Sequence, residues 1–358
     1  MRFGRLPTGL AGMLTWLSAS AALACSTVAL GLPERPIVAY SFDFAATGAG
    51  MVFVNPAGAA RSSIMEGVPA QWNIRYGSIT FNQLGPDMPA AGMNTAGLVV
   101  SLMWNDDAVY DVGGGAPVVN ELEFIQRLLD TSGSVDEALA TLQDIRIRGI
   151  VPIHFFLADR AGATAAVTPT AAGFLTHTGN DMPFPALTNS SYAELIEQAA
   201  IFEGFGGDHA VPSGDGLEDP SSLERFVMAA AASRRTSSSM IADQAFDVLD
   251  NVANASTRWQ IVFDPALQEI AFRIEGQERI HRIDMPQIDF RCRERPLSTE
   301  LGRISREGFP AALAPVDPAR VGGVSREVLA SFPKTVGLGP DLADGLTAGL
   351  LASVTCVP

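Results

Sequence analysis

The amino-acid sequence predicts an α+β fold in which antiparallel sheets form the inside of a layered sandwich and helices cover the outside. Three observations lead to this prediction. Short strand-like runs dominate the first half of the chain after residue 25, helical segments lie between and after them, and strand character returns around residues 258–286. Such an order of strands and helices favours sheets with helices on their outer faces.

The first predicted strands lie in residues 26–42, where two apolar runs on either side of a Pro-Glu-Arg-Pro turn indicate a hairpin. Residues 73–83 alternate between apolar and polar side chains, which is typical of a strand. Residues 97–104 are almost continuously apolar, as in a strand that is covered on both faces. A second hairpin is predicted in residues 153–169.

Helices are predicted where apolar or alanine residues recur at helical spacing. These segments are residues 119–129, 132–145, 192–202, 222–233 and 240–253. In the second of them, Ser134 stands three residues before Glu137, which is the pattern of a capping box. After about residue 285 the chain is rich in Pro, Arg and Gly. We therefore expect residues 25–285 to form the main domain and residues 286–358 to form a C-terminal extension of unknown role.

Residues 1–24 have the features of a secretory signal peptide. Two arginines precede an apolar run at residues 10–17, which is too short to span a membrane. Ala22 and Ala24 fit the small positions before a cleavage site. We therefore expect an exported protein, periplasmic or secreted, whose mature chain begins at Cys25; the alternative is an uncleaved membrane anchor.

The formal net charge is −15, and Lys334 is the only lysine of the chain. This acidic balance argues against a nucleic-acid partner, because nucleic-acid binding needs a basic surface. The four histidines are scattered, and the sequence has neither an H-x-x-x-H nor a C-x-x-C motif for zinc. Serine-nucleophile motifs and glycine-rich phosphate loops are also missing from the sequence. We therefore expect no metal and no cofactor.

The chain has three cysteines, of which Cys292 and Cys356 are candidates for a disulfide in an oxidising compartment. Cys25 is left over, and cleavage after Ala24 would make it the N-terminal residue. Its α-amine, with a pKa of about 7.7–8.0, is then a base for its own thiol, which ordinarily has a pKa of about 8.5. This pairing is the chemistry of an N-terminal nucleophile. The alternatives are a lipidated cysteine and a buried residue of the first strand.

Several segments in order along residues 25–283 resemble the choloylglycine hydrolase and penicillin V acylase family of linear amide hydrolases. The matching stretches are CSTVAL, YSFDF, YGSITFNQLGPDMPAAGMNTAGLVVSLMW, PIHFFLADRAG, ALTNSSY, SLERFV and TRWQIVFDP. The resemblance implies the four-layer αββα sandwich of N-terminal nucleophile hydrolases, with Cys25 as the catalytic nucleophile. It also implies hydrolysis of a nonpeptide C–N bond in a linear amide through a thioester.

The resemblance assigns roles to further residues. Asp43 corresponds to the aspartate that positions the cysteine, Asn189 to the asparagine of the oxyanion hole, and Arg225 to the active-site arginine. Trp104 or Asn105 falls at a position near the oxyanion where members of the family have Asn, Tyr or Trp. The chain departs from the family at one position, because Tyr40 stands where an arginine usually helps to hold the charge of the cysteine. Activation of Cys25 then depends on Arg225 or is weakened.

The expected substrate is a small amide with an apolar acyl group. Candidate lining residues of an acyl pocket are Phe42, Phe44, Met65, Phe81 and Met103, for each of which core packing is an equal alternative. The sequence does not distinguish between three candidate substrates: phenoxyacetyl penicillin, acyl-homoserine lactones and conjugated bile acids. It also leaves a homo-oligomer as one possible assembly. Two other functions also stay open, a lipid-anchored binding protein that has lost the chemistry and an acid-ceramidase-like lipid amidase.

Overall fold

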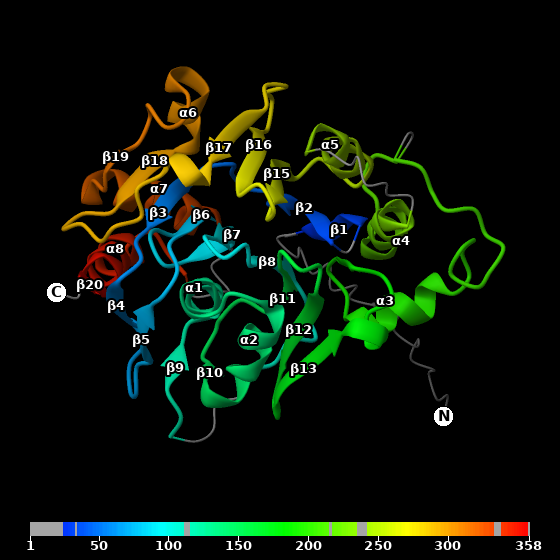
Figure 1. The fold of residues 1–358 in the computed structure, drawn as a ribbon, viewed down its shortest axis with the longest axis horizontal. Coiled ribbons are helices and arrows are strands. Elements are labelled where there is room, and N and C mark those ends of the chain that lie inside the picture. The colour runs from blue at the N-terminus through cyan, green and yellow to red at the C-terminus, as the bar shows by residue number, and fades with distance from the viewer. Residues whose placement is uncertain are drawn as a thin grey trace, which may run out of the picture.

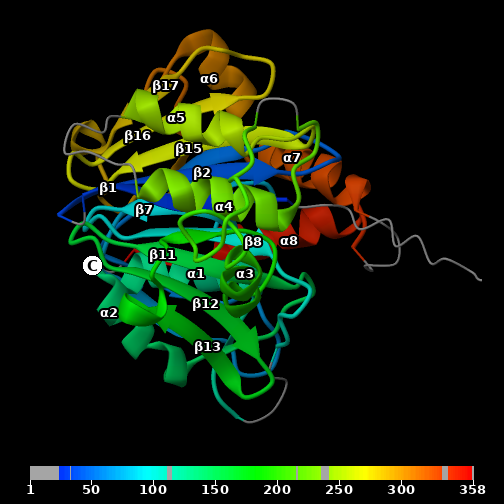
Figure 2. The same cartoon turned by 90° about the vertical axis from the view of Figure 1, so that its right-hand side faces the viewer.

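The computed structural model describes residues 24–32, 34–110, 115–214, 217–234, 242–332 and 338–356. Two large antiparallel sheets face each other, and helices cover their outer faces (Figures 1 and 2). The predicted four-layer αββα sandwich is therefore confirmed. The predicted signal peptide lies outside the described residues, except for Ala24.

The first sheet has six strands, and its centre is the predicted N-terminal hairpin. The strand order is β14 (Ala186–Leu187), β1 (Ser26–Leu32), β2 (Arg35–Asp43), β15 (Thr257–Asp264), β16 (Glu269–Ile274) and β17 (His281–Asp284). Ser26 pairs with Ser41 across β1 and β2, and Tyr40 pairs with Ile261 across β2 and β15. At the end of β1, Gly31 has a φ of +88°, and an added Cβ would lie 2.7 Å from the Arg35 carbonyl oxygen. The turn of this hairpin therefore requires glycine.

The second sheet has nine strands. Their order is β13 (Gly173–Thr178), β12 (Thr164–Thr170), β11 (Ile153–Ala158), β8 (Val99–Trp104), β7 (Pro89–Asn94), β6 (Ser78–Asn82), β3 (Met51–Asn55), β18 (Leu297–Glu300) and β19 (Ala314–Pro315). The apolar run at residues 97–104 becomes β8, which lies inside this sheet. The second predicted hairpin becomes β11 and β12.

The alternating segment at residues 73–83 contains β6, but both faces of this strand are buried. The Ser78 and Thr80 side chains of this strand are hydrogen-bonded inside the protein. The Asn55 amide donates to the Ser78 and Thr80 hydroxyls at 3.1 and 3.0 Å, and Gln126 of the neighbouring helix donates to Ser78 at 3.4 Å. A polar strand face can be buried when neighbours supply hydrogen bonds, so alternation alone does not predict exposure.

Five helices cover the two sheets. α1 (Glu121–Thr131) and α2 (Val135–Ala140) lie on the side of the nine-stranded sheet, α4 (Ser222–Ser233) and α5 (Ala242–Asn251) pack on the six-stranded sheet, and α3 (Tyr192–Ala199) packs on α4. The short strands β9 (Val118–Val119) and β10 (Arg146–Ile147) pair in parallel, and three 3₁₀ turns occupy Leu142–Asp144, Gly179–Asp181 and Met285–Gln287.

The caps explain where two of the predicted helices begin. α1 begins two residues later than expected, because residues 118 and 119 form β9 and Asn120 caps the helix together with Glu123. Ser134 caps α2 by accepting from the Glu137 backbone N–H at 3.2 Å. The reciprocal half of the expected capping box is replaced, because the Glu137 carboxylate accepts from the Gly133 N–H.

The C-terminal extension joins the rest of the molecule at several places. β18 pairs with β3 at the edge of the nine-stranded sheet, and β20 (Val354–Cys356) pairs with β4 (Ala59–Ser62), which pairs with β5 (Gln71–Ile74). Between these strands lie α6 (Leu301–Glu307), α7 (Pro318–Ser331) and α8 (Leu342–Ala352). The structure confirms a disulfide between Cys292 and Cys356, with a Cα–Cα distance of 5.6 Å.

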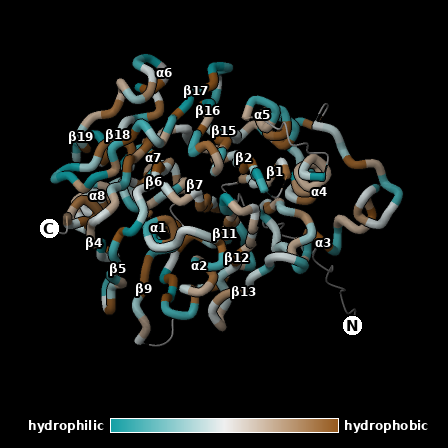
Figure 3. Tube along the Cα trace, in the orientation of Figure 1, coloured by the Kyte–Doolittle hydropathy of each residue, from teal (hydrophilic) through white to brown (hydrophobic). Residues whose placement is uncertain are grey.

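Hydrophobic segments are concentrated toward the inside of the molecule and hydrophilic segments toward the outer loops (Figure 3). One large apolar cluster runs from the N-terminal hairpin through both sheets to the covering helices. Among the described residues, no helix has both the length and the apolar character that a membrane span requires.

Candidate active site

Cys25 lies immediately before β1 and is completely buried. Its Sγ is 3.7 Å from the Tyr40 hydroxyl, which donates to it, and 3.9 Å from the Asp43 backbone oxygen. Continuing the β1–β2 register by one residue places Cys25 opposite Phe42. The predicted nucleophile therefore lies at the start of β1, inside the six-stranded sheet, and faces the end of strand β2.

The buried Asp43 carboxylate is held by three donors. Oδ1 accepts from the Ser41 hydroxyl at 2.6 Å and from the Thr257 hydroxyl at 2.7 Å, and Oδ2 accepts from the Asn254 amide at 3.0 Å. Burial raises the pKa of this carboxyl, while Arg225 and the three hydrogen bonds oppose the rise. These contacts fix the orientation of Asp43 beside Cys25.

Arg225 is buried in the first turn of α4 and points at residues 24–26. Its guanidinium donates to the Ala24 carbonyl, to the Cys25 carbonyl at 2.9 Å and to the Ser26 hydroxyl at 2.7 Å. Burial lowers the pKa of Arg225, and the charge of Asp43 opposes this change. The arginine therefore anchors the backbone around Cys25 and places a positive charge near it.

Asn189 follows β14 and is oriented from two sides. Its Oδ1 accepts from Arg225 at 2.8 Å, and its Nδ2 donates to the Trp104 backbone carbonyl at 3.1 Å. The Asn189 backbone N–H donates to the Ser222 hydroxyl at 3.0 Å. The structure thus joins Asn189, Arg225 and the end of β8 in one hydrogen-bonded group.

Trp104 and Asn105 direct their side chains to other partners. The Trp104 indole donates to Asp106 at 2.6 Å. The Asn105 amide is buried and lies 3.2 Å from Nδ1 of His154, and the Asn105 backbone N–H donates to the Pro152 carbonyl at 3.0 Å. The polar groups of Asn105 therefore support the loop after β8 and are not directed at Cys25.

Sequence reasoning missed the residues that support this group. His154 lies 2.6 Å from the Thr188 carbonyl, next to Asn189, and its burial lowers its pKa to about 4, so it is neutral near pH 7. Ser41 and Thr257 hold Asp43, as described above. The sequence could have indicated Ser41 as a partner of Asp43, because residues two apart in a strand share a face. Thr257 could not be found in this way, because it reaches Asp43 only through the pairing of β15 with β2.

The surroundings of Cys25 in the chain that still carries Ala24 favour the protonated thiol. Burial raises its pKa to about 12, the negative charge of Asp43 adds to the rise, and Arg225 opposes it. Burial raises the pKa of Tyr40 too, so its hydroxyl stays a neutral donor near pH 7. Because the Cys25 nitrogen is an amide in this chain, it offers no base.

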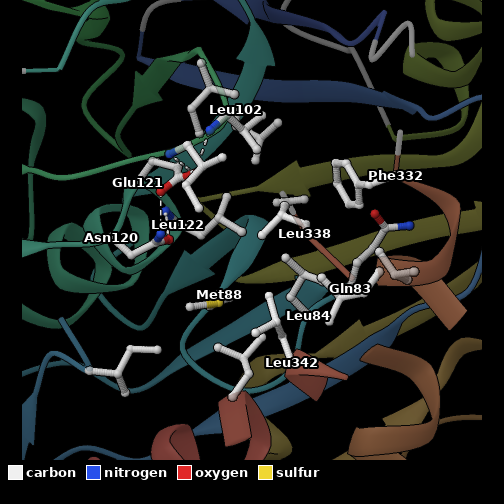
Figure 4. Close-up of a pocket in the computed structure, with 18 of the residues that line it drawn as sticks. Gln83, Leu84, Met88, Leu102, Asn120, Glu121, Leu122, Phe332, Leu338 and Leu342 are labelled. Carbon is white, nitrogen blue, oxygen red and sulfur yellow. Dashed lines mark hydrogen bonds between the residues drawn. The ribbon is translucent and has the colours of Figure 1, made fainter. Parts of the chain in front are cut away.

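A cavity of about 640 Å³ opens beside the site. Phe42 and Phe44 line it together with residues of β7, β8, β11 and α1 and of the C-terminal helices (Figure 4). Cys25 is not in its wall, but Phe42, which the β1–β2 register places opposite Cys25, is.

The other three predicted pocket residues lie elsewhere. Phe81 is buried in the core and packs edge-on against Phe272 at 5.1 Å between ring centroids. The Met103 sulfur accepts from the Thr27 hydroxyl at 3.1 Å between the two sheets. Met65 is partly buried, and its neighbours in sequence, Ile64 and Glu66, line the cavity in its place.

Two solved structures have the same fold as this chain. Penicillin V acylase from Agrobacterium tumefaciens superimposes with a TM-score of 0.67 at 23% identity, over 77% of this chain and 90% of that one. A variant of conjugated bile acid hydrolase from Clostridium perfringens superimposes with a TM-score of 0.60 at 19% identity, over 74% of this chain and 94% of that one.

Sequence comparison agrees with the structural likeness. A penicillin V acylase from Pectobacterium atrosepticum is 22% identical over 304 residues, which are 72% of this chain and 79% of that protein. No protein-family model matches the chain. The predicted resemblance to the choloylglycine hydrolase and penicillin V acylase family, and with it the N-terminal nucleophile hydrolase fold, is confirmed.

Proposed function

We propose that this relative of the penicillin V acylases hydrolyses the C–N bond of linear amides and uses Cys25 as its nucleophile once residues 1–24 have been removed. One observation carries the proposal. The buried thiol at the expected cleavage site lies against Asp43, Arg225 donates to the Cys25 carbonyl, and Asn189 is joined to this group through Arg225. The proposal places the mature enzyme outside the cytoplasm.

Cleavage changes the chemistry of Cys25 in two ways. It frees an α-amine with an ordinary pKa of about 7.7–8.0, which can accept the thiol proton. It also removes the Ala24 carbonyl, one of the acceptors of Arg225, while the contacts to Cys25 and Ser26 remain. The result is a nucleophile and a base in one residue, held beside a fixed positive charge.

The reaction follows in two steps. The Cys25 sulfur attacks the amide carbonyl, the α-amine passes the thiol proton to the leaving nitrogen, and the free amine departs from a thioester. A water molecule, deprotonated by the α-amine, then releases the carboxylic acid and the thiol. The Asn189 amide, aimed by Arg225, is the proposed donor to the oxyanion formed in each step.

Tyr40 gives this chain a variation of the mechanism. Its hydroxyl donates to the Cys25 sulfur at 3.7 Å, where a family arginine would supply a full charge. A neutral donor stabilises a thiolate less than a cation does. Arg225 is therefore the proposed source of positive charge for the activated thiolate.

The test combines N-terminal sequencing with an amide panel. The exported protein should begin with cysteine and should hydrolyse at least one of phenoxyacetyl penicillin, an acyl-homoserine lactone and a conjugated bile acid. Cys25→Ala is the blank, and Cys25→Ser should keep the fold and lose most turnover. Full turnover in Cys25→Ala would refute the proposal, whereas a lipid adduct on Cys25 together with no turnover would favour an anchored binding protein.

A further inference from the structure

We propose that His154 is a positioning residue of the active site, and that it holds the Asn189 amide in place by fixing the peptide bond between Thr188 and Asn189. The inference rests on the proposed amide hydrolysis, in which the Asn189 amide is the donor to the oxyanion. It adds a residue that acts through a neighbouring peptide bond and not on the substrate itself.

The hydrogen bonds of His154 fix where the proton of its ring lies. Nε2 is 2.6 Å from the Thr188 carbonyl oxygen, which can only accept, so Nε2 carries the proton and donates it. Nδ1 is then an acceptor, and the Asn105 amide donates to it at 3.2 Å. Burial lowers the pKa of His154 to about 4, so this neutral form persists near pH 7. Each ring nitrogen thus has a partner, and the ring serves as a support and not as a base.

The peptide bond before Asn189 is held at both ends. Its oxygen, which belongs to Thr188, accepts from His154, and its N–H, which belongs to Asn189, donates to the Ser222 hydroxyl at 3.0 Å. The Thr188 hydroxyl also donates to the Ser222 carbonyl at 2.9 Å. A peptide bond is planar, so fixing its oxygen and its nitrogen fixes the orientation of the whole plane. The starting point of the Asn189 side chain is therefore set by His154 on one side and by Ser222 on the other.

His154 also supports the group that the Asn189 side chain contacts. The Asn189 amide donates to the Trp104 carbonyl at 3.1 Å, and the next residue, Asn105, is the one that donates to His154. Strand β11, which carries His154, pairs with β8, which ends at Trp104, whereas Asn189 follows β14 of the other sheet. His154 therefore links the two sheets at the place where the Asn189 side chain spans them.

The supporting residues are more deeply buried than the residue they support. His154 and Thr188 have no exposed surface and Asn105 is 1% exposed, whereas Asn189 is half-buried. A buried polar group that loses its partner carries a large penalty. Removal of the imidazole would leave the Thr188 carbonyl and the Asn105 amide without this partner, so we expect the segment that carries Asn189 to shift.

The first experiment is a double-mutant cycle in the mature enzyme, measured on an amide that it hydrolyses. His154→Ala should lower kcat by about 10²-fold with little change in KM, because a displaced oxyanion donor costs rate and not ground-state binding. In the Asn189→Ala background, the same substitution should lower kcat by no more than about twofold, because the donor that it displaces is already missing. Equal losses in the two backgrounds would overturn the inference. If His154→Ala does not fold, His154→Asn takes its place.

Two conservative substitutions identify the hydrogen bond that matters. The amide nitrogen of glutamine reaches the position of Nε2 of histidine, whereas the amide of asparagine reaches only the position of Nδ1. His154→Gln can still donate to the Thr188 carbonyl and should restore most of kcat. His154→Asn should be about as impaired as His154→Ala, and the opposite order would overturn the inference.

His281→Gln is the matched control for these variants. His281 is also a buried histidine, but it lies in β17, at the edge of the six-stranded sheet opposite β14. This variant should keep a normal kcat. A loss as large as that of His154→Asn would show that removing any buried histidine impairs turnover, and it would overturn a specific role for His154.

A structural measurement separates this inference from the proposed function. Crystal structures of mature Cys25→Ala protein, with and without His154→Ala, should show that the hydrogen bond from the Asn189 amide to the Trp104 carbonyl is broken in the second protein. An unmoved Asn189 would overturn the inference even if turnover at Cys25 is confirmed. A displaced Asn189 in a protein whose wild type hydrolyses no amide would support the positioning role of His154 and contradict the proposed reaction.

Discussion

Retaining Ala24 in front of Cys25 should leave the thiol unreactive, because burial and the charge of Asp43 raise its pKa and an amide nitrogen offers no base to oppose them. With a pKa of about 12, about one thiol in 10⁵ is ionised at pH 7. An ordinary cysteine with a pKa of about 8.5 is about 3% ionised at the same pH. Because the thiolate is the reactive form, the chain that keeps Ala24 should react with iodoacetamide about 10³ times more slowly than an ordinary thiol.

The assay compares two purified proteins, one that begins at Cys25 and one that begins at Ala24. Cys292 and Cys356 are joined in a disulfide, so alkylation reports on Cys25 alone. The mature protein should react near neutral pH with a midpoint close to the pKa of its α-amine, and the longer protein should stay unreactive and inactive. Equal alkylation rates in the two proteins would refute the view that the free α-amine of Cys25 activates the buried thiol.

Three further predictions concern the surroundings of the site and the stability of the fold. Asn189→Ala should lower kcat by about 10²–10³ with little change in the melting temperature; steady-state kinetics would show a purely structural role if kcat stayed normal. Replacing both Cys292 and Cys356 by Ser opens a loop spanning 64 residues and should lower the free energy of unfolding by up to about 4 kcal/mol in urea titrations. An unchanged urea midpoint would contradict that role for the disulfide. Asp130 has its pKa raised from 3.8 to about 6 by burial, against the opposing charge of Arg61, so its stabilising contribution is complete below about pH 3.8 and is lost as the pH rises through about 6. Asp130→Asn should therefore flatten the dependence of the unfolding free energy on pH in this window. An unaltered pH dependence would exclude Asp130 as its source.

Local patterns in the sequence were sufficient for much of the fold. The hairpin of β1 and β2 follows from two apolar runs around a proline-containing turn, and the apolar run of β8 predicts its burial inside a sheet. Helix α4 was predicted with its observed ends, because apolar spacing and a serine N-cap coincide there. These signals act over a few residues, so they can be read without knowing the tertiary structure.

The site was predicted as far as family motifs reached. Motifs identified Cys25, Asp43, Asn189 and Arg225, which the structure places in one group. The orientation of Asn105 was not predictable, because it depends on His154 of a neighbouring strand.

The C-terminal extension shows the same limit on a larger scale. Pairing of β18 with β3 joins segments more than two hundred residues apart, and no short-range pattern reports such a contact. The Pro-, Arg- and Gly-rich composition after residue 285 indicated an extension of unknown role and did not predict helices α6, α7 and α8. The packing of Phe332 on Phe44, which brings this segment to the cavity, was likewise invisible in the sequence.

The enclosure of the bond between Ala24 and Cys25 sets an order of events. The Ala24 N–H already donates to Asp43, its carbonyl is held by Arg225, and Cys25 has no surface exposed to solvent. Under the proposed removal of residues 1–24, a peptidase that binds an extended stretch of chain would have to cut before β1 pairs with β2. Folding before that cut would leave Cys25 buried behind Ala24 and without the free α-amine that the proposed mechanism needs.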